Sequence, residues 1–225
     1  VLAHQWGQPV RVDNKPGASG IVAFGEVRRT PADGHTLFLA DTATLAVTAV
    51  VTGVAEPFAL TVADRAYVSS AAMDGDSVVA VDLDLGMALA DRTLNTAARG
   101  LAAAPAGDVV YVARCGDDVA DIVAVDVTTG RMTVIPVAHG AGATVDAVRT
   151  NADASRLFAT LRTAAGSAVA VIDTRACRVV QTIAVEGSIG DIAVHRDGRR
   201  VFATCWDDER GGAVAVIDAR AGRVV

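Results

Sequence analysis

The sequence has 225 residues, a formal net charge of −6 and 52% hydrophobic residues. This length can form one large β domain or two small domains with a buried core. Charged and turn residues interrupt every apolar run before it reaches the roughly 18 residues of a membrane helix, which argues against a membrane span. No basic face with interleaved aromatic residues is visible, which argues against nucleic-acid binding.

Cysteines and histidines show no metal-binding or disulfide pattern. The three cysteines, Cys115, Cys177 and Cys205, are odd in number and lack C-x-x-C spacing. We interpret them as small buried hydrophobic residues. The four histidines are scattered along the chain. We therefore expect no metal and no cofactor, and we assign no catalytic residue.

The first part, residues 1–55, has the pattern of a short βαβ segment. A strand PVRVDN is followed by the turn KPGASG, a helix from Ile21 to Arg29, a P-A-D-G turn and a strand HTLFLAD. Free N–H groups and the helix dipole at the start of this helix favour an anion such as a carboxylate. Small residues are also what a strand-to-helix turn needs, so both interpretations of the turn stay open.

The order G-Q-P-V-x-V-x-N-K-P-G-A-x-G, an A-x-x-x-V-x-R helix and P-A-D-G-H-T-L-F-L over residues 2–50 resembles the Bug-type solute receptors of tripartite tricarboxylate transporters. The resemblance implies a periplasmic protein that captures small carboxylates through loop backbone groups. The matching ligand-binding positions are Asn14, Gly17, Ala18 and Gly20. Ser19 replaces the family's usual Gly and His35 its usual Tyr. The receptor's second lobe has no counterpart here, so a fused or fragmentary receptor remnant is the alternative interpretation.

Residues 56–225 repeat one pattern about every 45 residues. A strand phrase such as V-A-V-D or V-I-D recurs with spacings of 44, 47 and 45 residues, ending at Asp82, Asp126, Asp173 and Asp218. An aromatic residue precedes each Asp by 15 or 16 residues, at Tyr67, Tyr111, Phe158 and Phe202. Two landmarks that keep one period define four repeat units.

Each unit reads as four short strands joined by turns, with β-branched residues and no helical periodicity. Four strands in about 45 residues are typical of a β-propeller blade. The predicted fold is therefore mainly β: a partial β-propeller of about four four-stranded blades, preceded by the short βαβ segment. The predicted blades cover approximately residues 58–95, 98–140, 145–187 and 189–225.

The four repeated aspartates are predicted to be structural turn residues. Each ends a third strand, where its carboxylate can accept N–H groups of the following turn; a calcium or catalytic role is the alternative. The residue four places on is Gly86, Gly130 or Gly222 in three units and Cys177 in the other. A turn that closes in the left-handed region favours Gly, so we expect Cys177 to be strained or to lie in a different turn.

The aromatic-Val strand, the V-I-D phrase, the V-V-x-T-I-x-V strand and the D-G-R-R-V-F turn resemble YVTN-type β-propeller repeats over residues 58–225. The family is related in shape to lactonase-like propellers. Residues 152–155 depart from the pattern because they lack the D-G turn.

A non-catalytic binding or interaction module, extracytoplasmic by resemblance of both parts, is the function that we expect. Its partner would be a protein or small ligand. A lactonase-like hydrolase is one alternative and would use His195, Arg149 and Asp191; a small-carboxylate receptor is the other. The fourth unit ends within its outer strand at Val225, so we expect its edge to need a partner strand or to favour self-association.

Overall fold

The computed structural model describes residues 54, 56–63, 65–72, 75–82, 87–94, 97–209 and 211–225. They all belong to one unit, Val51–Val225. The predicted βαβ segment lies outside the described residues, and so do Asn14, Gly17, Ala18 and Gly20. The division of the chain into residues 1–55 and 56–225 therefore stays a prediction.

Every consecutive group of four strands forms one antiparallel sheet, which we call a blade. Blade 1 contains β1 (Pro57–Val62), β2 (Ala66–Ala72), β3 (Gly75–Asp82) and β4 (Met87–Thr93). Blade 2 contains β5 (Ala97–Ala103), β6 (Val109–Cys115), β7 (Val119–Asp126) and β8 (Met132–His139).

Blades 3 and 4 have the same strand order. Blade 3 contains β9 (Val148–Thr150), β10 (Arg156–Thr163), β11 (Gly166–Asp173) and β12 (Arg178–Val185). Blade 4 contains β13 (Ser188–Val194), β14 (Arg200–Asp207), β15 (Gly211–Asp218) and β16 (Arg223–Val224). Four such sheets confirm the predicted fold class of a partial β-propeller.

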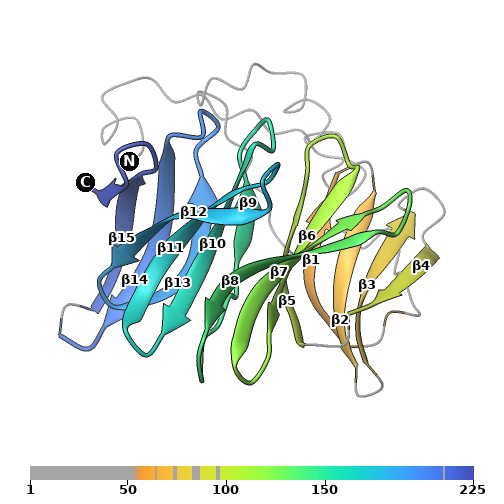
Figure 1. The fold of residues 1–225 in the computed structure, drawn as a ribbon, viewed down its shortest axis with the longest axis horizontal. Helices are drawn as coiled ribbons and strands as arrows, with labels where there is room; N and C mark the ends of the chain where they lie inside the picture. The colour runs from red at the N-terminus through yellow and green to blue at the C-terminus, as the bar shows by residue number, and fades with distance from the viewer. Residues whose placement is uncertain are drawn as a thin grey trace, which may run out of the picture. The chain divides into compact units, whose positions relative to one another are not determined.

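The four blades stand side by side, from blade 1 in orange to blade 4 in blue (Figure 1). Their first strands contact one another in series, β1 with β5, β5 with β9 and β9 with β13. The outer strand β12 contacts both β8 and β16. Because the sheets meet through their faces, both faces of a central blade must be apolar.

Aromatic residues of the second strands fill the contacts between blades. Tyr67, Tyr111 and Phe158 are 2%, 5% and 1% exposed, and each packs against aliphatic side chains of the following blade. Phe158, for example, shares a cluster with Val201 and Ile217 of blade 4. The fourth aromatic residue, Phe202, is partly exposed. The repeated aromatic landmark is thus the residue that joins one blade to the next.

A buried ion pair holds blade 2 to the connection that enters it. Arg114 donates from Nε and Nη2 to the two carboxylate oxygens of Asp121, both at 2.8 Å, and from Nη1 to the Leu94 carbonyl at 2.9 Å. The two side chains are only 16% and 12% exposed. A pair enclosed to this degree leaves a costly unpaired charge when one partner is removed, so we assign it to structure.

The packing predicts unequal costs for two equivalent substitutions. Phe158→Ala should lower the free energy of unfolding by about 3–5 kcal/mol, because it opens a cavity between blades 3 and 4. Phe202→Ala should cost clearly less, since that side chain is already partly exposed. Urea denaturation of both variants measures the difference. Equal losses of stability would contradict the proposed role of the aromatic contact.

Candidate functional site

A β-bulge interrupts the first strand of blades 1, 2 and 4, and in blades 1 and 4 a second-strand hydroxyl group accepts a backbone N–H there. The pairing shifts register between Pro57 and Ala59, between Ala98 and Leu101, and between Ile189 and Ile192. An unpaired backbone N–H results wherever the extra residue has no partner across the strand pair.

The hydroxyl residue lies two positions after the aromatic landmark. Ala59 N–H donates to Ser69 Oγ at 3.0 Å, Ala147 N–H donates to Thr160 Oγ1 at 2.9 Å, and Asp191 N–H donates to Thr204 Oγ1 at 2.9 Å. Sequence reasoning missed these residues, although the third letters of Y-V-S, F-A-T and F-A-T carry the signal.

In blade 2 no hydroxyl group is available to accept the N–H of the bulge, because Ala113 occupies the equivalent position. Gly100 N–H donates instead to the Asp146 carbonyl oxygen of blade 3 at 2.9 Å. A Cβ at Gly100 would lie 2.4 Å from that oxygen. Only Gly permits this close approach of β5 to the backbone just before β9.

Arg149 and Asp191 form an ion pair between the first strands of blades 3 and 4. Arg149 Nη2 donates to Asp191 Oδ1 at 3.0 Å and to Oδ2 at 3.1 Å, and Nη1 donates to the Val148 carbonyl at 2.8 Å. Asp191 lies in the bulge of β13, where its Oδ1 also accepts the Ile192 N–H at 2.8 Å. The bulge therefore aims this carboxylate at the neighbouring blade.

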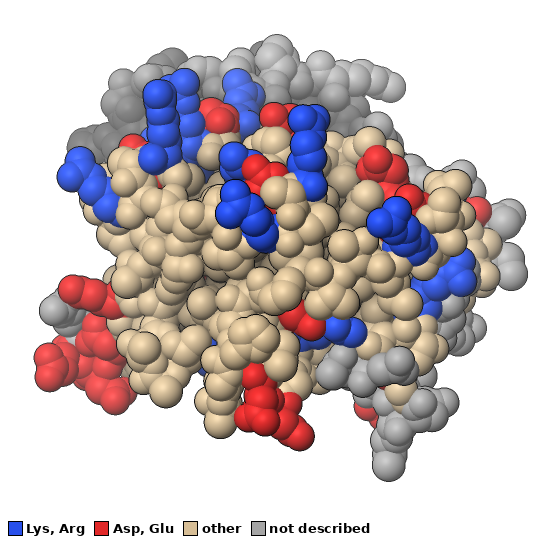
Figure 2. Space-filling model, viewed as in Figure 1, with Lys and Arg blue, Asp and Glu red and all other residues tan. Residues whose placement is uncertain are grey.

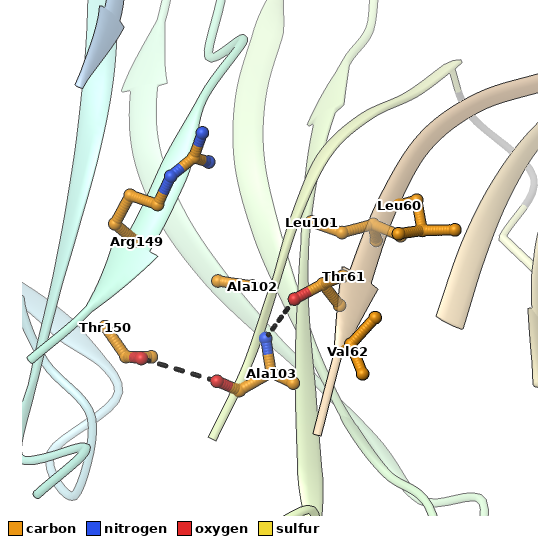
Figure 3. A pocket seen from close by; sticks show the side chains of 8 residues that line it. All are labelled: Leu60, Thr61, Val62, Leu101, Ala102, Ala103, Arg149 and Thr150. Carbon is orange, nitrogen blue, oxygen red and sulfur yellow. Dashed lines mark hydrogen bonds between the residues drawn. The ribbon is translucent and has the colours of Figure 1, made fainter. Parts of the chain in front are cut away.

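A hollow of about 390 Å³ lies beside Arg149, between the first strands of blades 1, 2 and 3. We call it the inner-strand hollow. Its lining residues come from β1, β5 and β9 and are Leu60, Thr61, Val62, Leu101, Ala102, Ala103, Arg149 and Thr150. Figure 3 shows that Thr61 and Thr150 hold the central strand from both sides. Ala103 N–H donates to Thr61 Oγ1, and Thr150 Oγ1 donates to the Ala103 carbonyl, both at 3.3 Å.

A second hollow of about 720 Å³ lies between β12 and the strands β14 and β15. Its wall is formed largely by aliphatic residues, among them Ile183, Val214 and Val224, with Glu186 and Asp207 at the end. We take the smaller hollow as the candidate site. It lies between the first strands of three blades, and its lining includes Arg149 and two threonines.

His195 does not contact the Arg149–Asp191 pair in the described structure. Its Nδ1 lies 2.9 Å from Asp197 Oδ1 in the turn between β13 and β14. The Arg199 N–H donates to the same Asp197 oxygen at 2.9 Å. This backbone hydrogen bond, and then His195, lower the pKa of Asp197 to about 2.

Three of the four repeated aspartates accept backbone hydrogen bonds in the turn after the third strand. Asp126 Oδ1 accepts from Thr128 and Thr129, Asp173 Oδ1 from Ala176, and Asp218 Oδ1 from Arg220 and Ala221, at 2.8–3.0 Å. These N–H groups lower the pKa of all three carboxyls. Asp82 ends β3, but its turn lies outside the described residues. The structural role of the aspartates stays a prediction.

Cys177 adopts the left-handed conformation that the repeat pattern predicts for a glycine. Its φ is 49°, against 70° for Gly130 and 68° for Gly222 at the equivalent positions. A non-glycine residue is strained in this region, so the prediction of strain at Cys177 is confirmed. Ala154, in the turn that lacks D-G, has a φ of 54°.

The three thiols, predicted to be small buried hydrophobic residues, are free and partly buried. Cys115 ends β6, Cys177 lies in a turn and Cys205 belongs to blade 4. Cys177 and Cys205 pack against the clusters between blades, and Cys115 Sγ accepts the Val145 N–H at 3.3 Å. Burial nonetheless raises the pKa of the Cys115 thiol.

Charged residues separate along the strand direction. Figure 2 shows Lys and Arg gathered mainly along its upper part, interspersed with Asp and Glu, and mainly Asp and Glu along its lower edge. Arginines occur in or beside the turns between first and second and between third and fourth strands: Arg131, Arg175, Arg178, Arg199, Arg200, Arg220 and Arg223. Acidic residues occupy turns between second and third strands: Asp117, Asp118, Asp208 and Glu209. The arginine end also carries Asp126, Asp173, Asp197 and Asp218, so it presents mixed charge, whereas these second-to-third-strand turns are acidic.

The described residues form neither a metal-binding cluster nor a membrane-spanning helix. None of their His, Cys, Asp and Glu side chains form a group of three or more that could hold a metal ion. No helix of membrane-spanning length and apolarity occurs in this part of the chain.

The blades define a propeller-type chain, and comparison with known proteins agrees. The chain is 29% identical over 222 residues to the seven-bladed beta-propeller protein Rv1057 of Mycobacterium tuberculosis, an alignment that covers 84% of this chain and 56% of the relative. The chain thus spans about half the length of that relative.

Solved propeller structures support the same fold. Hydrazine synthase of Kuenenia stuttgartiensis superposes with a TM-score of 0.67 at 21% identity, over 79% of this chain and 50% of that one. TolB of Acinetobacter baumannii superposes with a TM-score of 0.55 at 16% identity, over 71% and 39%. At these identities the likeness concerns the fold alone.

The N-terminal part matches a different family. Residues 1–79 match the model of the tripartite tricarboxylate transporter family receptor. The resemblance predicted over residues 2–50 is confirmed. The match also extends into blade 1, through β1 and β2 and as far as Val79 of β3.

We predict that the fold loses stability in acid as the turn carboxylate of Asp197 becomes protonated. A pKa lowered by folding means that Asp197 stabilises the fold above its unfolded pKa of about 4, and that this contribution disappears as the pH falls toward 2. Asp197→Asn should therefore flatten the fall of the urea midpoint between pH 4 and pH 2. Exposed Asp117 provides the control, since Asp117→Asn should leave the curve unchanged. Identical curves for wild type and Asp197→Asn would refute the role of this turn.

Proposed function

We propose that the chain is a non-catalytic binding module whose propeller part takes a small ligand in the inner-strand hollow. One observation supports the proposal: first strands from three blades line one open space, and its lining includes Arg149 and two threonines. Small ligands bind in concave sites that hold a few placed polar groups. The volume of about 390 Å³ falls within their usual range of about 300–1,000 Å³.

The lining favours binding over hydrolysis. Its eight residues are Leu, Thr, Val, Ala and Arg, so no side chain among them exchanges a proton near neutral pH. A hydrolase of the lactonase-like type would need a base at the reacting bond. The histidine considered from the sequence, His195, does not line the hollow and contacts Asp197 in a turn.

An extracytoplasmic location and a YVTN type of propeller belong to the same proposal. The match of residues 1–79 to a transporter receptor family supports the location. The recurrence of the V-I-D phrase and the aromatic-Val strand supports the repeat type. A protein partner at the turn ends of the blades would also suit a propeller.

The hollow can be tested with a fragment library of small acids, amides and alcohols. Fragments that bind should shift the NMR signals of the Leu60 and Leu101 methyl groups, because both side chains line the hollow. Val62→Trp should abolish these shifts by filling the space from the 54% exposed position of Val62. Val134→Trp, at a 50% exposed position on the outer strand β8, is the matched control. Unchanged binding to Val62→Trp would contradict the proposal.

A second candidate function is suggested by the family match: capture of a small carboxylate by the N-terminal residues. Asn14, Gly17, Ala18 and Gly20 would supply the site, at the start of the predicted helix. Di- and tricarboxylates should then raise the melting temperature of the chain in a dose-dependent way. Gly20→Asp should abolish that rise, while Val62→Trp should preserve it. A rise that survives Gly20→Asp would exclude this site.

A further inference from the structure

We draw no further inference here: the strongest candidate, the second hollow along the edge of β15 between blades 3 and 4, carries none because nothing among the described residues shows what covers it.

Discussion

Face-to-face packing of the blades is the constraint on which the described structure depends. Each central sheet is apolar on both faces, so it cannot be stable without a neighbour on either side. The second-strand aromatic residue fills each contact, as Phe158 does against Val201 and Ile217. Stability in such an array is approximately a sum over neighbouring units. The four blades therefore form one cooperative stack rather than four independent sheets.

The candidate site is a product of this stacking. No single blade forms the inner-strand hollow, because its walls come from β1, β5 and β9. The Arg149–Asp191 pair likewise joins β9 to β13. The hydroxyl groups of Ser69 and Thr204 hold the bulges of β1 and β13, and Thr160 holds the backbone just before β9. The backbone conformation of these first strands thus depends on hydroxyl groups of the second strands.

The repeat period was enough to predict the blades from the sequence. Two landmarks in fixed register place the second and third strands, and the glycine missing at Cys177 correctly predicts a strained turn. The bulges could not be predicted, because they depend on how two backbones align rather than on one side chain. The hollow could not be predicted either, because its lining residues come from segments about 40 positions apart and are mostly Ala, Leu and Val. Arg149 and Asp191 were named together from the sequence, but their ion pair could not be predicted, because it forms only when blades 3 and 4 stack.

Hydrogen exchange of the Phe158→Ala variant tests the central claim of coupled blades most directly. If stacking carries the stability, amides of β10 and β11 in blade 3 and those of β13 and β14 in blade 4 should lose protection together. The amides of blade 1, which lies two contacts away, should lose much less. Loss of protection confined to blade 3 would contradict the account, because it would mean that each blade is stable by itself.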